Sequence, residues 1–370
     1  MVFMLALYVH IPFCLKKCFY CSFPVVVGKT DKAALYLSFL KREARNFFGQ
    51  TIGTVYLGGG TPTELRVRDL EDLCAWIRTT FILPKTAEWT VEMNPEGVSD
   101  EKLSVLRAFG VNRVSLGAQS FQDSFLRSVG RVHREEDIYR AYRLIRKAGW
   151  DNVNVDMMYG LPGQDIGDFQ KDLNRLMSLD PDHVSVYALT PEEGSRFYTR
   201  GQTLPSTTLQ AEQYRYLVVE LEHRGWAQYE VSNFARQGKL CVHNRHYWRG
   251  GNYLGLGLGA HSHRNGHRYW NTDRWPVYID RMRRGLSVRG GEEFLNPAQR
   301  QTESLVFGLR MNEGVCLREL ARRFQRPLRE DQIRFLSEAI ALGWLSRRGD
   351  RVQTTLNGRL VLDGICRRLM

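Results

Sequence analysis

Three of the seven cysteines, Cys14, Cys18 and Cys21, fall within eight consecutive positions and have the spacing CxxxCxxC. Three thiolates on one short loop can each bind a different iron of a [4Fe–4S] cluster, which leaves the fourth iron free to chelate another molecule. A zinc site is the alternative, with His10 as a candidate fourth ligand, although strand alternation would point His10 away from Cys14. Structural zinc often uses two C-x2-C pairs, and the sequence has no second pair. The spacing therefore favours the iron–sulfur cluster.

The remaining cysteines lie far apart, so the sequence lacks the dense disulfide framework of small secreted domains. Residues 1–13 are apolar, but they lack the basic segment and the small-residue cleavage site of a signal peptide. No stretch reaches the roughly 20 apolar residues that a membrane span needs. We therefore expect a cytoplasmic protein whose cysteines stay reduced.

The net charge of +12 would suit a phosphate backbone, an anionic membrane surface or an acidic small molecule, and composition alone does not separate these partners. Residues 291–370 contain 14 arginines and 10 acidic residues, which gives this part a charge of +4. This charge density is only modestly above the average of the chain, and the charges form no stripe that would read a nucleic-acid groove. The sequence therefore does not favour nucleic acid as a partner.

Strand-like and helix-like segments alternate through the first half of the chain. Six β-branched or aromatic segments end in turn residues, at positions 6–12, 54–58, 88–93, 112–116, 152–157 and 183–189. Segments with apolar residues at helical spacing lie between them, among them 32–48, 65–80, 134–148 and 208–223. This alternation predicts parallel β/α units and therefore an α/β fold.

Polar residues and glycines follow the ends of these predicted strands. The cysteine loop follows the first strand, and glycines 58–60 follow the second. Glu92 ends the third strand, Gln119 follows the fourth, and Asp156 lies at the end of the fifth. Functional residues of parallel β/α folds collect at the carboxyl ends of the strands. We therefore expect these residues to share one mouth of a barrel.

The pattern changes beyond residue 235. Residues 238–275 are rich in Gly, His, Tyr and Trp and show no clear period. Helical patterns return from residue 297, and residues 343–355 predict a hairpin that turns at Gly349 and Asp350 before a last helix. We divide the chain into a core barrel at 1–235, a His- and aromatic-rich segment at 236–296, and a smaller, helical, winged-helix-like domain at 297–370.

With these motifs the sequence resembles the radical S-adenosylmethionine (SAM) superfamily, and within it the oxygen-independent coproporphyrinogen III oxidases and their relatives. Besides the cysteine loop, the motifs are YVHIPF at 8–13, YLGGGTPT at 56–63, EMNP at 92–95, RVSLGAQSF at 113–121, GRVH at 130–133 and NVDMMYGLPGQ at 154–164. The resemblance covers nearly the whole chain and implies a partial (β/α)6 barrel with SAM on the open iron of the cluster. In this superfamily the reduced cluster cleaves SAM to a 5′-deoxyadenosyl radical, and the protein supplies the enclosure.

The resemblance also implies which residues contact SAM. Gly59 and Gly60 allow close approach of the backbone and would hold the methionyl end, with the Thr61 hydroxyl beside them. Glu92 and Asp156 are suited to an ammonium group or to ribose hydroxyls. The full set expected around SAM is Tyr8, Tyr20, Gly59, Gly60, Thr61, Glu92, Gln119, Arg131 and Asp156.

A second motif separates the branches of this family. Residues 243–248, HNRHYW, match the HNxxYW motif of the haem chaperone branch, the HemW-type proteins, and five of the nine histidines lie between 243 and 267. Imidazole is a common axial ligand of haem iron. We expect His243 to be that ligand, with Cys241 and His246 as rivals. The haem contacts that the resemblance implies are His243, Asn244, Tyr247 and Trp248.

Two departures from the oxidases point to the same branch. The oxidases carry a further cysteine two residues after the third, where this chain has Phe23, and an extension ahead of the first strand, whereas His10 is close to the start here. We therefore expect a haem chaperone that binds haem and a SAM-liganded cluster. It would deliver haem to respiratory haem proteins at the membrane and use an electron donor. Peripheral contact with the membrane surface would fit that role.

The alternative is an enzyme, either an oxygen-independent coproporphyrinogen III oxidase or another radical SAM enzyme that modifies a tetrapyrrole. Turnover of such a substrate would distinguish the enzyme from the chaperone. The sequence identifies no catalytic acid or base, so we assign no catalytic residue.

Overall fold

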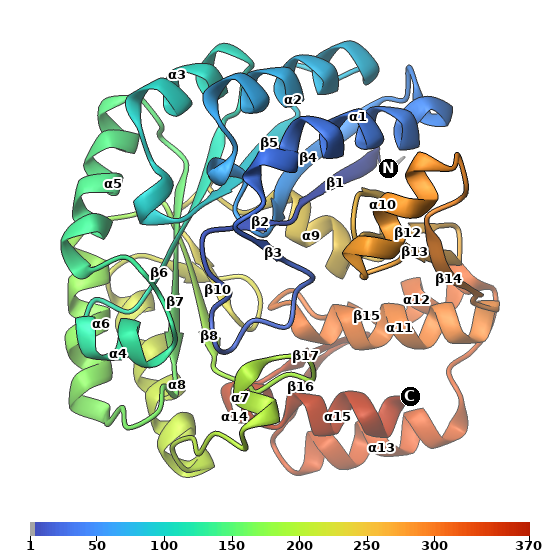
Figure 1. The fold of residues 1–370 in the computed structure, drawn as a ribbon. Coiled ribbons are helices and arrows are strands. Elements are labelled where there is room, and N and C mark those ends of the chain that lie inside the picture. Colours follow the sequence, from blue (N-terminus) through green and yellow to red (C-terminus); the bar gives the residue numbers. More distant parts are fainter. Residues whose placement is uncertain (1–3) are drawn as a thin grey trace.

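The computed structural model describes residues 4–370. Within these residues, twelve strands form one mixed sheet in the order β14-β13-β12-β11-β1-β4-β5-β6-β7-β8-β10-β9 (Figure 1). The strands are β1 (Leu5–Ile11), β4 (Ile52–Gly59), β5 (Glu88–Met93), β6 (Arg113–Gln119), β7 (Val153–Tyr159), β8 (His183–Ala188), β9 (Ala227–Gln228), β10 (Asn233–Ala235), β11 (Tyr253–Leu256), β12 (His261–Arg264), β13 (His267–Asn271) and β14 (Arg289–Phe294).

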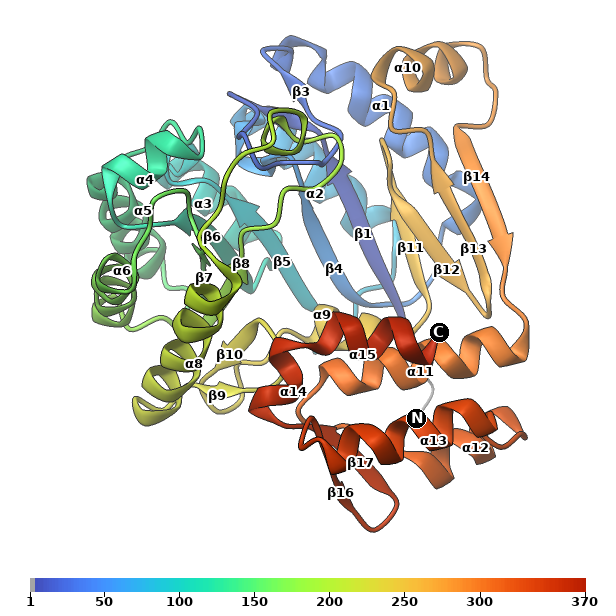
Figure 2. The same ribbon diagram turned by 90° about the horizontal axis from the view of Figure 1, so that it is seen from below.

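Six neighbouring strands of this sheet are the six that the sequence predicts. β1, β4, β5, β6, β7 and β8 pair in parallel and in chain order. Helices connect them and lie on the outer side of the sheet (Figures 1 and 2). These helices are α1 (Ala33–Glu43), α2 (Val67–Thr80), α3 (Asp100–Ala108), α4 (Asp123–Ser128), α5 (Glu135–Lys147) and α6 (Ile166–Ser178). Two further helices, α7 (Arg196–Thr199) and α8 (Thr207–His223), follow β8. The arrangement confirms the predicted α/β fold with a partial (β/α)6 barrel.

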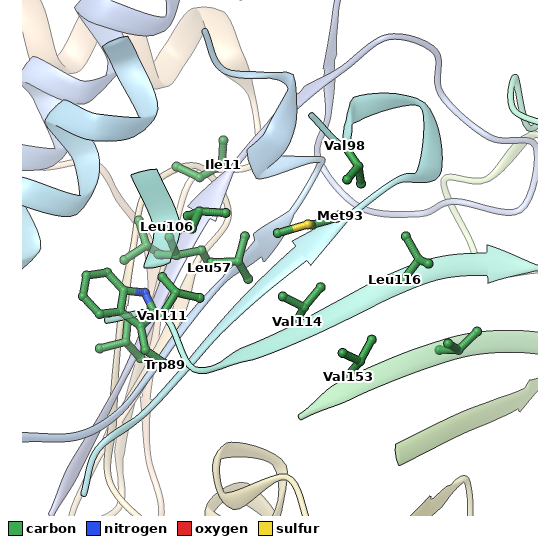
Figure 3. Packing of buried hydrophobic residues seen from close by; sticks show 14 of the residues in the cluster. Ile11, Leu57, Trp89, Met93, Val98, Leu106, Val111, Val114, Leu116 and Val153 are labelled. Atoms are coloured by element: carbon green, nitrogen blue, oxygen red, sulfur yellow. The ribbon is translucent and has the colours of Figure 1, made fainter. Parts of the chain in front are cut away.

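An apolar core holds the parallel strands to the helices. In Figure 3, Leu57 of β4, Trp89 of β5 and Val114 of β6 lie together with Leu106 of α3. Leu57, Val114 and Leu106 are 0% exposed, and burial of each such side chain contributes roughly 1.5–3 kcal/mol. Apolar packing therefore holds the strands in place. The residues at the carboxyl ends of the strands are not needed for this packing and can be polar.

The sheet continues past β1 into a segment where the sequence shows no period. β11 pairs in parallel with β1, and β12, β13 and β14 follow in antiparallel order. A Cβ on Gly255 would lie 2.0 Å from the carbonyl oxygen of His261, so the approach of β12 to β11 requires glycine. β14 is largely exposed and therefore carries no apolar alternation. The helices α9 (Val242–Trp248) and α10 (Trp275–Arg283) lie in the same part of the chain.

The C-terminal part of the chain forms a smaller unit of helices and a hairpin, as predicted. In this unit β15 (Val315–Cys316), β17 (Arg351–Thr354) and β16 (Leu345–Arg348) make a second sheet, and the hairpin turns at Gly349 and Asp350. The helices are α11 (Pro297–Arg310), α12 (Leu317–Phe324), α13 (Glu330–Ala341), α14 (Leu356–Leu360) and α15 (Leu362–Leu369). Figure 2 shows this unit next to β9 and β10, and a bridge between Glu230 and Met311 joins them.

The division of the chain at residues 1–235, 236–296 and 297–370 remains a prediction. Among the helices of residues 4–370, none combines the length and the apolar composition needed to cross a membrane.

Candidate functional site

The cysteine loop leaves the end of β1 and is closed by a short parallel pair, β2 (Phe13–Cys14) and β3 (Val26–Val27). Cys14, Cys18 and Cys21 lie on this loop as half-buried free thiols. The backbone of the loop is anchored to the barrel, because the amide of Phe19 donates to the carbonyl of Val129 at 3.0 Å. The structure therefore brings the three predicted ligands to one mouth of the barrel on a fixed loop.

The surroundings of these thiols fit an iron–sulfur cluster. Burial raises the pKa of Cys14 to about 12 and also raises the pKa of Cys21, so a bound cation is needed to hold the thiolates that ligate metal. Nη1 of Arg131 lies 3.6 Å from Sγ of Cys18, and the Thr61 hydroxyl lies 3.7 Å from Sγ of Cys14. Within residues 4–370, no three His, Cys, Asp or Glu side chains form a group that could hold a metal ion. In a cubane cluster each thiolate binds a different iron.

His10, the fourth ligand of the zinc alternative, has both ring nitrogens engaged elsewhere. Its Nε2 donates to the Pro24 carbonyl at 2.9 Å, and its Nδ1 accepts from the Tyr8 hydroxyl at 3.0 Å. Burial lowers the pKa of His10 to about 4, so the ring is neutral. His10 therefore orders the cysteine loop and Tyr8, and it does not join the cysteines.

The glycine run at the end of β4 packs against the end of β1, from which the cysteine loop leaves. The amide of Gly60 donates to the Ile11 carbonyl at 2.9 Å, and a Cβ on Gly60 would lie 2.6 Å from that same oxygen. Gly59 has a φ of 103°, and a Cβ there would lie 2.2 Å from the His10 ring. Glycine is therefore required at both positions by the close approach of two strand ends.

The predicted carboxylates lie at the mouth beside this run. Glu92 accepts from the Tyr56 hydroxyl at 2.9 Å and from the Gly59 amide at 3.1 Å, and burial raises its pKa to about 7. Asp156 accepts from the Ser115 hydroxyl at 2.9 Å, and burial raises its pKa as well. Both residues are only half-buried, and Glu92 lines a cavity at the mouth.

Gln119 and Arg131 complete the predicted polar set. Gln119 has a φ of 73° and stands where the pairing of β6 with β7 shifts register, a bulge that re-aims its side chain. Arg131 donates from Nη2 to Oδ1 of Asn94 at 2.7 Å and to the carbonyl of Gly117. In the described part of the chain the buried Nε of Arg131 has no hydrogen-bond partner. Tyr20 lies on the cysteine loop and packs against an apolar cluster that includes Phe125 and Leu161, and burial raises the pKa of its hydroxyl.

The HNRHYW motif forms α9, whose N-terminus is held by a carboxylate that the sequence did not single out. Glu88, at the start of β5, accepts from the amide of Val242 at 2.8 Å and from the amide of His243 at 2.9 Å. A carboxylate is favourable at the positive end of a helix. Glu88 shows no sequence signal for this role, because its partners lie more than 150 residues away in the chain.

His243 itself is enclosed. Its Nδ1 lies 2.8 Å from the Thr54 hydroxyl and its Nε2 lies 3.0 Å from the Tyr247 hydroxyl, and the residue is 1% exposed. Burial lowers the pKa of His243 to about 3, so the ring is neutral. Both ring nitrogens of the expected iron ligand are thus bonded within the protein. Of its rivals, Cys241 is buried against Glu88, and Nε2 of His246 bonds to the Asn252 carbonyl at 2.7 Å.

One cavity of 1060 Å³ connects the predicted haem residues with part of the predicted SAM site, namely Tyr8, Gly59 and Glu92, whereas none of the three cluster cysteines lines it. This volume lies at the upper end for ligand pockets. The barrel contributes Tyr8, Tyr56, Gly59 and Glu92 to its lining. Helix α9 contributes His243, Asn244, Tyr247 and Trp248. β12 and β13 contribute His261, His263, Arg268 and Trp270, and the C-terminal unit contributes Arg300, Glu303, Phe307, Arg323 and Phe324. The sequence predicted both sites but not that they share a cavity.

The C-terminal wall of the cavity carries two arginines without counter-ions. The guanidinium groups of Arg300 and Arg323 lie 5.8 Å and 5.2 Å from the centroid of the Phe324 ring. Within residues 4–370, neither arginine forms an ion pair, whereas nearby Arg268 pairs with Glu293 at 3.1 Å. Burial and the charge of Arg300 lower the pKa of Arg323. This wall is therefore suited to an anionic group of a ligand.

Comparison with known proteins agrees with the motifs. A model of the radical SAM superfamily matches residues 8–176, and a model of the HemN C-terminal domain matches residues 295–361. Heme chaperone HemW of Bacillus subtilis is 36% identical and covers 87% of each chain, and heme chaperone HemW of Escherichia coli is 33% identical and covers 98% of this chain and 97% of the relative. The solved structure of coproporphyrinogen III oxidase (HemN) from Escherichia coli matches with a TM-score of 0.89 at 26% identity, over 99% of this chain and 90% of that chain. These matches confirm the resemblance drawn from the motifs.

Proposed function

This chain belongs to the HemW family within the radical SAM superfamily, and we propose on that premise that it is a haem chaperone. It binds haem in the 1060 Å³ cavity, holds a SAM-liganded [4Fe–4S] cluster at the barrel mouth, and delivers haem to respiratory haem proteins at the membrane. The observation that carries the proposal is the shared cavity, which the HNRHYW helix and the strand ends of the barrel line together.

The residues at the mouth suit a cluster and SAM. Cys14, Cys18 and Cys21 supply the thiolates, and Arg131 places a positive charge beside one of them. When bound, the cluster would supply one electron for the reductive cleavage of SAM. An electron donor is needed to reduce the cluster. The chain itself orders the loop, keeps the mouth partly closed to water and aligns the ligand.

The polar groups around the mouth suit the charged parts of SAM. Glu92, with a pKa of about 7, is held in its ionised form when a cation such as an ammonium group approaches it. The unpartnered Nε of Arg131 is a donor for a carboxylate. Asp156 and Gln119 are suited to hydroxyl groups. Gly59, Gly60 and Thr61 bring the backbone close to the ligand. Tyr8 precedes the cysteine loop and Tyr20 lies on it.

The other walls of the cavity suit a porphyrin. The rings of Tyr247 and Trp248 offer apolar surface, and Asn244 adds a polar group on the same helix. Arg300 and Arg323 would pair with the two propionates of haem, which are the only charged groups on its edge. Burial of a carboxylate against two unpaired guanidinium groups is favourable because both charges gain a partner.

The alternative function is oxidative decarboxylation of coproporphyrinogen III, which the match to the HemN structure over 99% of this chain favours. Phe23 argues against it, because an exposed phenylalanine lines the cavity where the oxidases carry a further cysteine. Turnover of coproporphyrinogen III by the reconstituted protein would establish the enzyme.

The test is a haem titration of the anaerobically reconstituted protein, followed by the Soret band and by the haem retained after desalting. We expect one haem per chain and transfer of that haem to an apo respiratory haem protein in membrane vesicles. Trp248→Leu should weaken haem retention, whereas Trp275→Leu, a half-buried tryptophan that does not line the cavity, should not. A wild-type protein that retains no haem would contradict the chaperone function.

A further inference from the structure

Four histidines line the cavity and could offer a nitrogen to a metal inside it: His10, His243, His261 and His263. A neutral imidazole binds metal through the nitrogen that carries no proton, and the second nitrogen is usually held by a hydrogen bond. The histidine that ligates an incoming iron must therefore have a ring nitrogen that the protein does not already occupy.

Three of these histidines have both ring nitrogens bonded. His10 lies between Tyr8 and Pro24, and His243 lies between Thr54 and Tyr247. His263 follows the same pattern. Its Nδ1 lies 3.4 Å from the Gly251 carbonyl, and its Nε2 accepts from the Gly266 amide at 3.1 Å. To bind iron, each of these rings would first have to break a bond that also orders the cavity wall.

His261 differs from the other three. It is the first residue of β12, and it is exposed to the cavity. Its ring stacks on Trp270 of β13, with centroids 5.5 Å apart and planes at 19°. Within residues 4–370, neither ring nitrogen of His261 has a hydrogen-bond partner. The ring is therefore oriented by packing while its nitrogens remain available.

The protonation state of His261 also suits a metal ligand. Burial lowers its pKa, with a smaller contribution in the same direction from Arg268, so the ring is neutral at neutral pH. A neutral ring has a lone pair for iron.

We propose that His261, in place of His243, is the axial ligand of haem iron, with Trp270 as the residue that positions its ring. This assignment rests on the proposed function, because it concerns the haem that the chaperone carries. His243 then has a structural role, since its bonds to Thr54 and Tyr247 fix α9 as a wall of the cavity. The assignment also places the iron on the antiparallel extension of the sheet, in the cavity that Arg300 and Arg323 line as well.

The experiment compares ferric haem bound to the full-length reconstituted chain and to four variants, which are His261→Ala, His261→Gln, His243→Ala and His267→Ala. His261→Ala should shift the Soret band and speed haem loss by more than the roughly tenfold that loss of an outer-shell partner costs, and free imidazole should restore the spectrum. His261→Gln, which keeps the size of the side chain, should shift the band in the same way. His267→Ala is the matched control, because His267 lies in the same hairpin but stacks on Phe294, which does not line the cavity.

The outcomes separate the assignment from the function. If wild type retains haem and both His261 variants keep its spectrum, the assignment is wrong and the chaperone function stands. If His243→Ala alone loses the histidine-ligated spectrum, the ligand is His243. A histidine-ligated spectrum that persists in His243→Ala and disappears in His261→Ala supports the assignment. If wild type binds no haem, the proposed function and the assignment both fail.

Discussion

The parallel half of the sheet and the walls opposite it face the same cavity, but they use their polar side chains differently. In the parallel half, polar groups bond to one another, as when the Tyr56 hydroxyl donates to Glu92 at 2.9 Å. On the antiparallel extension His261 has no hydrogen-bond partner within residues 4–370, and on the C-terminal helices Arg300 and Arg323 have no ion pair there. The polar groups of the barrel mouth are held for small cofactors, whereas the other walls keep three groups, His261, Arg300 and Arg323, available for a larger ligand.

This difference implies that substitutions can disable the cluster site and the haem site independently, although both sites border one cavity. Residues of the cysteine loop are bonded to the barrel, and the groups assigned to haem belong to α9, β12, β13 and the C-terminal helices. Variants that disable one site should therefore leave the other measurable.

The largest expected effect comes from the cysteine loop. Cys18→Ser removes one of three cluster ligands, and we expect the iron and sulfide bound per chain to fall to background. Haem retention should change little, because the haem site lies on other elements. Cys316→Ser, a half-buried cysteine of the C-terminal unit, is the control and should bind a full cluster. Loss of haem together with the cluster would show that the two regions act as one site.

The second largest effect is expected on stability, from a substitution where the ends of β1 and β4 pack together. Gly60→Ala places a Cβ 2.6 Å from the carbonyl oxygen of Ile11, and because backbone yields little, we expect a loss of about 1–3 kcal/mol of unfolding free energy. Gly364→Ala, where a Cβ meets nothing within 4 Å, is the control and should be neutral or stabilising. Thermal unfolding of both variants measures the effect. Equal stability of the two variants would contradict the close packing of the ends of β1 and β4.

Removal of the unpaired positive charges should have a moderate effect. Arg300→Gln with Arg323→Gln should weaken haem binding by about tenfold or more, because charged hydrogen bonds contribute roughly 1.5–3 kcal/mol each. Arg318→Gln, an exposed arginine on the same helix as Arg323 that pairs with Asp350, is the control. Haem dimethyl ester should bind wild type and the double variant alike. If the double variant still prefers haem over the ester, the propionates lie elsewhere.

The last expected effect, a pH dependence, concerns Glu92. Burial raises its pKa in the folded chain to about 7, above the value of about 4.5 that it has when unfolded, so ionisation opposes folding. Without SAM, the stability that wild type owes to the neutral form is lost as the pH rises through 7. We expect Glu92→Gln to gain stability relative to wild type between about pH 5 and about pH 8. Glu71→Gln, at an exposed position, should show no such trend, and a pH-independent difference for Glu92→Gln would contradict the burial.

The parallel half of the fold could be predicted from the sequence because each strand is an apolar run that ends in turn residues. The positions of Glu92 and Asp156 followed from the same pattern, since the carboxyl ends of parallel strands share one mouth. β11 to β14 could not be predicted in this way. Glycines such as Gly255 interrupt their alternation, and the pairing partner of β11 is β1, more than 240 residues earlier.

The details of the cavity also lay beyond the sequence. A histidine is available to a metal only if its ring nitrogens are not already hydrogen-bonded. Some of these hydrogen bonds go to backbone carbonyls, as from His263 to Gly251, and the pattern of side chains in a sequence does not predict them. Glu88 was missed for a similar reason, because it binds the backbone amides of α9. The motif at 243–248 indicates a haem site, but the geometry of the cavity is needed to choose among its histidines.

The most direct test of the central claim, that one cavity holds haem beside the cluster site, is a crystal structure of the reconstituted, haem-loaded chain with anomalous scattering from iron. We expect two iron-containing sites, the four irons of the cluster at the cysteine loop and the single haem iron within bonding distance of the His261 ring, with the propionates at Arg300 and Arg323. Haem iron outside the cavity lined by α9, β12 and β13 would contradict it.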